Sequence, residues 1–430
     1  MARACSDARS CPFDDCDRVS PVENGLCRAT RGLHATMSTL QSKVRPPEDR
    51  MKKSLVALII ACAAWLPPAA QGQIANVRLY GNLNLDFELV SGKQPDDRNP
   101  TVNRVSSNSS RFGLRGTEYL GRGQVAIFQI ESSINGDTNA GNLGGRETFV
   151  GLQGDWGTLK LGRFLTPYDD ILPIFGNAPT LTTSILSTAA VWAQGPLSKV
   201  QGGFDARLGN SLRYETPPLG GFLGELQYSS RDSSGNADGA DNGDHTSELR
   251  HANVVSIGAF YNKGPLDLGI AYERNNNVRF ANAGDDALSI AGAYDFGTIA
   301  GAVGLRVGAV YERLRYDTPT GDLKRDFWGF SATVPVGGGS IYAFWGHAAN
   351  GKGGAVDGTA IGGLTKGADS ACDQWELSYS YPLSLRTLIY AGYVRLNNRA
   401  NAGYGFNIND YSTAAGARPT GYVVGMAHFF

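Results

Sequence analysis

Residues 77–89 read Val-Arg-Leu-Tyr-Gly-Asn-Leu-Asn-Leu-Asp-Phe-Glu-Leu, with an apolar residue or glycine at every odd position and a polar residue or tyrosine at every even one. This period of two is typical of a β-strand with one apolar and one polar face. Strands of soluble sheets are usually about 5–6 residues long, whereas a strand tilted through a bilayer needs about 9–11. The segment is therefore long enough to cross a membrane.

The same alternation returns along the chain. It recurs in residues 266–273, 374–381 and 422–430. In a membrane barrel the apolar face of each strand meets lipid and the polar face lines a water-filled lumen. A charged side chain near the middle of the lipid face would cost about 2–4 kcal/mol, so charges must be confined to the other face.

Turn signals divide the alternating runs into hairpins. Short turns are predicted at 154–157, 218–221, 262–265, 295–297, 336–339 and 382–384. Longer polar stretches, 231–250, 350–373 and 397–419, separate these hairpins. Sixteen candidate strands begin near Val77, Arg111, Val125, Arg146, Thr158, Arg207, Phe222, Val254, Leu266, Leu288, Val303, Phe327, Ile341, Trp375, Leu388 and Tyr422. An even number lets the two ends of the sheet pair. The pattern predicts an all-β, 16-stranded antiparallel transmembrane β-barrel with short periplasmic turns and long extracellular loops.

Composition agrees with a β-rich chain that contains many turns. Of 430 residues, 42% are apolar, 18% are charged and 56 are glycine, and the formal net charge is -1. The absence of a basic excess argues against nucleic acid as a partner. A helical membrane protein needs about 20 consecutive apolar residues for each span, and the one comparable run, near Leu55, is too short.

The N-terminal 72 residues are expected to contain a signal peptide and no part of the barrel. Residues 51–72 combine Met51-Lys52-Lys53, an apolar segment and the small-residue pattern Ala70-Gln71-Gly72, which indicates a signal peptide. Residues 1–50 show no apolar periodicity, and we interpret them as a disordered, over-extended start that precedes a true beginning at Met51. The barrel domain is expected at 73–430. It contains one cysteine, Cys372, and so no intrachain disulfide.

Several strings resemble the general porins of Gram-negative outer membranes, and most closely the β-proteobacterial trimeric type. They are Val77–Gly81, Ser110–Glu118, Phe149–Leu152, Leu161–Arg163 and Asn210–Tyr214, in the family's order, followed by a terminal phenylalanine. The resemblance covers about Gln73 to Phe430. It implies a homotrimer in the cell outer membrane, surrounded by lipid and lipopolysaccharide, that passes small hydrophilic solutes and ions without cofactor or metal. It also implies a third loop, about Phe164 to Phe204, that folds into the barrel.

The resemblance further implies a constriction at which wall arginines face acidic residues of the third loop. The matching positions are Arg111, Arg146, Arg207 and Arg213 on the wall and Asp169 and Asp170 on the loop. Strand parity adds Arg78, Asp86, Glu88 and Arg115 as further lumen-facing residues. Arginine stays charged at working pH, so such a cluster holds a fixed field across a narrow pore. Weak anion selectivity is therefore expected, because this local field outweighs the distant loop charges.

Two features of this prediction stay open. Any one of these arginines could simply neutralise an interior carboxylate. Arg146 fits worst, because the positions of its own parity, Thr148, Val150 and Leu152, are more apolar than a lumen face should be, so this strand could instead be buried between subunits.

Other functions fit the sequence less well. An outer-membrane enzyme needs an activated nucleophile or base, and the barrel's four histidines lie in no such setting, so no catalytic residue is predicted. A substrate-specific channel of 18 strands is the main alternative. A plugged uptake receptor would need about 22 strands. In loop 236–248 an EF-hand frame that starts at Asp238 lacks two essential oxygen ligands, at Ala240 and Leu249.

The C-terminal run Tyr422, Val424, Met426, His428, Phe430 places every second side chain on one face. The final ring is then expected in the interfacial belt of the closing strand. The resemblance implies that Tyr422 and Phe430 form the signal that the outer-membrane barrel assembly machinery recognises.

Overall fold

The computed structural model describes residues 76–96, 99–138, 141–180, 184–194, 203–230, 252–297, 304–406 and 414–430. The chain divides into two units, Met1–Ala69 and Ala70–Phe430, and all described residues belong to the second. The expected leader segments 1–50 and 51–72 and the loop 236–248 lie outside the described residues. No helix within the described ranges combines the length and the apolar character that a membrane span requires.

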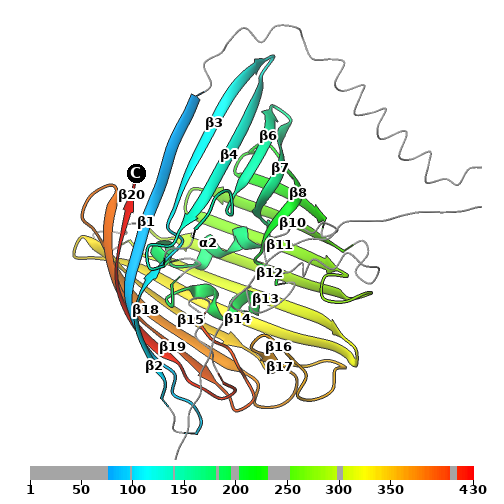
Figure 1. Ribbon diagram of the computed structural model, residues 1–430, viewed down its shortest axis with the longest axis vertical. Coiled ribbons are helices and arrows are strands. Elements are labelled where there is room, and N and C mark those ends of the chain that lie inside the picture. The colour runs from blue at the N-terminus through cyan, green and yellow to red at the C-terminus, as the bar shows by residue number, and fades with distance from the viewer. Residues whose placement is uncertain are drawn as a thin grey trace, which may run out of the picture. The chain divides into compact units, whose positions relative to one another are not determined.

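The described residues are almost entirely β-structure (Figure 1). The first half contains β1 (Asn76–Ser91), β2 (Thr101–Ser107), β3 (Arg111–Gly121), β4 (Gln124–Ile134), β5 (Gly141–Asn142), β6 (Thr148–Gly154), β7 (Gly157–Leu165), β8 (Arg207–Glu215), β9 (Phe222–Ser230) and β10 (Asn253–Lys263). The second half contains β11 (Leu266–Asn276), β12 (Gly284–Asp295), β13 (Arg306–Thr318), β14 (Gly321–Val336), β15 (Gly339–Ala348), β16 (Ala360–Ile361), β17 (Leu364–Thr365), β18 (Cys372–Pro382), β19 (Thr387–Asn398) and β20 (Thr420–Phe429). Between β7 and β8 lie η1 (Asp169–Ile171), α2 (Leu172–Phe175), η2 (Ala178–Thr180), η3 (Thr188–Ala190) and η4 (Trp192–Gln194).

The sheet closes on itself. β20 pairs antiparallel with β1, from Phe429 opposite Asn82 to Thr420 opposite Ser91. β2 and β3 both pair with β1, and β5 and β6 both pair with β4, so each pair of segments acts as one broken strand. The sheet's 18 segments thus make a closed antiparallel barrel of 16 strands. This confirms the predicted fold and excludes the 18-stranded alternative.

Five of the six predicted short turns join neighbouring strands at one end of the barrel, whereas the sixth, at 295–297, begins the longer connection from β12 to β13, of which residues 298–303 lie outside the described residues. The long connections lie at the other end, which is therefore extracellular. Some strand starts were predicted several residues too late: β12 begins at Gly284 rather than near Leu288, and β14 at Gly321 rather than near Phe327. The alternation of apolar and polar residues does not reach the extracellular ends of these strands, because polar residues lie on both faces there.

The two faces of each strand differ as the alternation predicts. In β1, Leu83, Phe87 and Leu89 are between 42% and 48% exposed on the outside, whereas Asp86 and Glu88 on the inside are 3% and 0% exposed. Outward aromatic residues mark the periplasmic edge of the apolar band, among them Phe222, Tyr294 and Tyr381. Others mark its extracellular edge, among them Tyr272, Trp328, Trp375 and Tyr422.

The third loop lies inside the barrel and forms a hydrophobic core with part of the wall. Its residues Tyr168, Ile171, Phe175 and Trp192 are at most 1% exposed. They belong to one cluster with small inward residues of β11 to β13, namely Ala271, Ala287, Ala291, Ala293 and Val310. The expectation that every inner face is polar and wet is thus wrong for these strands, because the loop covers them.

Glycine on the wall makes room for this loop. A Cβ atom at Gly269 of β11 would lie 2.6 Å from Ile174 Cδ1, and one at Gly392 of β19 would lie 2.7 Å from Leu186 Cδ1. Polar contacts fix the loop between these points: Tyr342 donates to the carbonyl of Phe175 at 2.7 Å, and the Trp192 indole donates to Ser289 Oγ at 3.2 Å.

We expect Gly269→Val to unseat the third loop, because the added methyl groups would overlap Ile174. Overpacking of this kind costs about 1–3 kcal/mol. Thermal unfolding of the purified barrel in detergent should show a lower midpoint. Gly292→Val, on the lipid-facing side of β12, is the matched control and should leave the midpoint nearly unchanged. An equal fall of the unfolding midpoint in both variants would show that Gly269 is not needed for the packing of the third loop.

Candidate pore constriction

Arg213 joins the start of the third loop to the barrel wall. Its side chain is inward on β8, where Nη2 lies 2.6 Å from Asp170 Oδ2 and 2.6 Å from Glu225 Oε2, and Nε lies 3.1 Å from Glu215 Oε1. Nη1 donates to the carbonyl of Leu165 at 3.0 Å. Two of the predicted constriction residues, Arg213 and Asp170, are therefore in direct contact. The carboxylates of Asp170, Glu215 and Glu225 together neutralise the charge of Arg213, so the main effect of this residue is to position the loop.

A second cluster surrounds Glu131 on the inner face of β4. Arg146 Nε lies 2.6 Å from Glu131 Oε1, and Arg111 Nε lies 3.5 Å from Oε2. Tyr80 donates to the same carboxylate at 2.9 Å. Arg111 and Arg146 thus meet each other across a wall carboxylate and not across the pore.

The structure removes the parity objection to Arg146. β6 begins at Thr148, so Arg146 precedes the strand, and the alternation of inward and outward side chains along β6 does not apply to it. Its side chain turns inward to Glu131, while Val150 and Leu152 face outward and are 57% and 43% exposed. Phe149 shares the inner face with Gln129.

Asp169 lies at the beginning of η1 and is 6% exposed. Burial, and next the neighbouring Asp170 carboxylate, raise the pKa of Asp169 to about 7, while Arg207 and Arg146 oppose this rise. Arg207, at the start of β8, therefore acts on Asp169 through its field. Asp205 lies close by, and burial together with Asp169 raises its pKa well above the ordinary value.

The wall from β1 to β7 carries further inward cations towards the periplasmic end. Arg78 and Arg115 are cross-strand neighbours, and Gln129 is the neighbour of Arg115 on β4. These three side chains and Phe149 line a recess of about 380 Å³. Lys160 continues the row on β7, where it pairs with Glu215 at 2.6 Å.

Asp86 and Glu88 lie on the inner face of β1, where both are buried. Asp86 accepts a hydrogen bond from Ser184 of the third loop at 3.0 Å, and Glu88 pairs with Arg104 at 2.9 Å. The opposite wall holds the loop in the same way. There Glu312, ion-paired with Arg325, accepts a hydrogen bond from Tyr168 at 2.6 Å.

Four residues of these clusters were not predicted from the sequence: Glu131, Glu215, Glu225 and Lys160. A signal was present for Glu131, because Gln129 and Glu131 alternate with Phe128 and Ile130 and so share the polar face. No comparable signal marks Glu225 or Lys160, since their roles depend on which strands become neighbours.

Comparison with known proteins agrees with this geometry. Residues 56–401 match the family described as Gram-negative porin. Outer membrane porin protein 32 of Delftia acidovorans is 29% identical over 397 residues, which cover 88% of this chain and 100% of the relative. An outer membrane porin protein of Bordetella pertussis is 28% identical, with the same coverage of 88% and 100%.

A solved structure shows the same fold. The anion-selective porin from Comamonas acidovorans superimposes with a TM-score of 0.65 at 24% identity, covering 83% of this chain and all of that one, 100%. With a closed barrel, an apolar band outside and a loop inside that contacts charged residues of the wall, this chain belongs to the Gram-negative porin family and is a passive channel of the outer membrane.

Proposed function

We propose that this porin passes small hydrophilic solutes and ions by diffusion, with a weak preference for anions, and that it has no enzymatic activity. The proposed constriction comprises Arg111, Arg146, Arg207 and Arg213 with Asp169 and Asp170. The observation that carries the preference is the placement of inward cations. The third loop covers the inner faces of β11 to β15 and β18 to β20 and reaches Asp86 of β1. The wall that it leaves uncovered carries Arg78, Arg111, Arg115, Arg146 and Lys160.

Charge in a narrow, low-dielectric-walled passage acts on a passing ion more strongly than charge in distant loops. The carboxylates on this wall, such as Glu131 at 5% exposed, are more deeply buried than the cations they hold. Arg111 keeps 32% of its side chain accessible. An anion therefore meets guanidinium groups first. The likeness to a porin whose title names anion selectivity supports the same proposal.

We further propose that the barrel assembles as a homotrimer among outer-membrane lipid and lipopolysaccharide, after removal of a signal peptide at 51–72. The outward residues of β1, β3, β4 and β6 support a subunit contact, since Leu83, Leu114, Ile130 and Val150 are all apolar and at least 39% exposed. Insertion would depend on the barrel assembly machinery, with Tyr422 and Phe430 as its recognition signal.

Channel activity and selectivity can be measured together in planar bilayers. The wild-type protein should give discrete ohmic steps and a reversal potential that favours anions. The variant Arg111→Gln/Arg146→Gln/Glu131→Gln loses one net positive charge without leaving Glu131 unpaired. A unit charge about 8 Å away in water contributes about 0.5 kcal/mol, which is roughly a twofold change in anion preference at low salt.

Arg386→Gln, in a periplasmic turn, is the control and should keep the wild-type reversal potential. Absence of any conductance step in the wild type would refute the channel function. A clear cation preference in the wild type would refute only the role given to the arginines.

Selectivity should depend on pH through Asp169. Because its pKa is raised to about 7, lowering the pH from 8 to 6 protonates Asp169 and removes a negative charge from the constriction. Anion preference should therefore rise as the pH falls. Asp169→Asn should show the low-pH selectivity at both pH values. A pH response that persists in Asp169→Asn and vanishes in Asp205→Asn would assign the effect to Asp205 instead.

The role of Phe430 in assembly can be tested by a substitution that leaves the pairing of β20 with β1 intact. The backbone of Phe430 exchanges two hydrogen bonds with Gly81, at 3.0 and 3.1 Å, and these survive in Phe430→Ala. We expect this variant to accumulate as periplasmic monomer, with less heat-modifiable trimer in the outer membrane, while barrel refolded in detergent keeps its unfolding midpoint. Phe429→Ala is the matched control and should insert normally. Equal trimer yield in Phe430→Ala and wild type would contradict a recognition role.

A further inference from the structure

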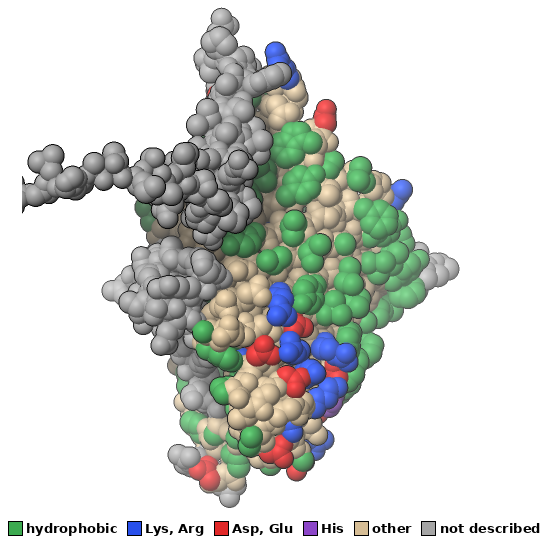
Figure 2. Space-filling view, turned by 90° about the vertical axis from the view of Figure 1, so that its right-hand side faces the viewer, with side chains coloured by type: hydrophobic (Ala, Val, Ile, Leu, Met, Phe, Trp, Pro, Cys, Tyr) green, Lys and Arg blue, Asp and Glu red, His purple; other side chains and the backbone are tan. Residues whose placement is uncertain are grey.

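Charged side chains gather on the outside of the barrel at the extracellular ends of β11 to β14 (Figure 2). We call this set the outer-wall charge cluster. It consists of Arg274, Asp286, Arg313, Arg315, Asp317, Asp322, Lys324, Asp326 and, from the loop after β15, Lys352. Register places Arg274, Asp286, Arg315 and Lys324 side by side across four strands.

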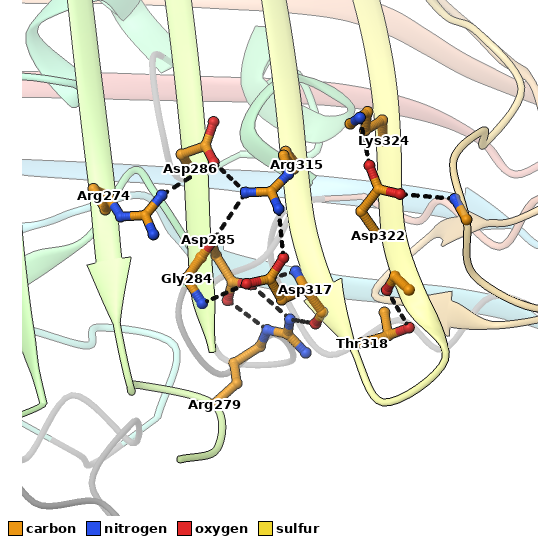
Figure 3. A network of polar contacts seen from close by, with 12 residues as sticks. Arg274, Arg279, Gly284, Asp285, Asp286, Arg315, Asp317, Thr318, Asp322 and Lys324 are labelled. Carbon is orange, nitrogen blue, oxygen red and sulfur yellow. Dashed lines mark hydrogen bonds and ion pairs between the residues drawn. The ribbon is translucent and has the colours of Figure 1, made fainter. Parts of the chain in front are cut away.

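These residues point away from the lumen. Inward positions on β13 are even, such as Glu312 at 0% exposed, so Arg313 and Arg315 face outward. Figure 3 shows Arg315 between Asp286 and Asp317, at 3.0 and 2.8 Å, with Arg274 on the far side of Asp286 at 3.5 Å. The cluster therefore cannot act on solutes in the pore.

Its depth is fixed by the aromatic residues beside it. Tyr311 and Trp328 are cross-strand neighbours at the extracellular edge of the apolar band. Arg313 and Asp326 are the next outward pair, about 7 Å further along the strands. Since aromatic girdles mark the boundary between hydrocarbon and headgroups, the cluster lies at the height of the headgroups of the outer leaflet.

Within the cluster the cations are on the surface and the carboxylates lie beneath them. The side chains of Arg313 and Lys352 are each 55% exposed, and both contact Asp326, which is 7% exposed. Arg274 is 40% exposed beside Asp286 at 25%. The carboxylates hold the cationic groups in place, while the remaining N–H donors of the guanidinium and ammonium groups face outward.

We propose that the outer-wall charge cluster binds the phosphate groups of lipid in the outer leaflet. Five cations against four carboxylates leave a positive surface, and guanidinium groups match phosphate geometry with paired donors. The inference rests on the proposed lipid surroundings of the barrel and adds the site and the chemical group recognised. By contrast, the outward positions of β1 from Leu83 to Leu89 carry no charge.

The test uses the full purified porin and lipid A in detergent, either with both phosphates or with the phosphates removed, and counts bound lipid by native mass spectrometry. Wild type should bind the phosphorylated lipid better. In the variant Arg313→Gln/Asp326→Asn/Lys352→Gln the buried carboxylate is removed together with its two cations, so the fold is spared. Because one cation near an anionic lipid surface contributes about 1 kcal/mol, affinity should fall about fivefold or more.

Lys263→Gln/Arg386→Gln, which removes two cations at the periplasmic end, is the matched control and should bind phosphorylated lipid as wild type does. Equal binding of the two lipids by wild type, or equal losses in both variants, would overturn the proposal. Unchanged lipid binding with loss of trimer in the first variant would also overturn it and identify the cluster as a protein contact. Single-channel conductance, recorded for every variant, reports the channel function separately, because these residues lie outside the pore.

Discussion

The pairing of β20 with β1 is the constraint on which the rest of this structure depends. Hydrocarbon offers no partner for a backbone N–H or C=O group, so a sheet in a membrane is stable only when it has no free edge. Here the seam runs from Ser91 opposite Thr420 to Asn82 opposite Phe429, and the two hydrogen bonds between Gly81 and Phe430 extend it to the last residue. Closure makes every strand pair with two others. It also divides the side chains strictly into those that face lipid and those that face the interior.

The interior is itself divided into two regions. On β11 to β15 the third loop replaces water, and its aromatic residues pack on alanine, glycine and valine of the wall. On the periplasmic part of β1 and on β3, β4, β6 and β7 the wall stays accessible and holds arginine and lysine beside half-covered carboxylates. The pore is therefore lined unequally, with a rigid loop on one side and a cationic wall on the other. The hydrogen bonds of Asn177 to Glu376 and Ser378, at 2.7 and 2.8 Å, fix the loop far from its own strands.

Most of the fold could be predicted from the sequence, because a period of two and a turn are local patterns. The sixteen strands and five of the six short turns follow from them. The ends of β12 and β14 could not be predicted, since polar residues on both faces erase the alternation there. The residues of the proposed constriction were named through resemblance. Arg213 contacts Asp170, but the partner of Arg146 is Glu131, a residue on another strand, and such a contact depends on register that no local pattern contains.

The hydrophobic cluster inside the barrel has a consequence for how the protein can change. An inward residue such as Ala291 or Val310 is a core residue in the ordinary sense, and a larger side chain there must displace Trp192, Phe175 or their neighbours. An inward residue of β3, β4 or β7 has open space before it and can vary in size and charge at little cost to packing. Substitutions that change which solutes pass are therefore restricted to the part of the wall that the loop leaves uncovered. The wall that the loop covers is constrained by the same packing rules as the interior of a soluble protein.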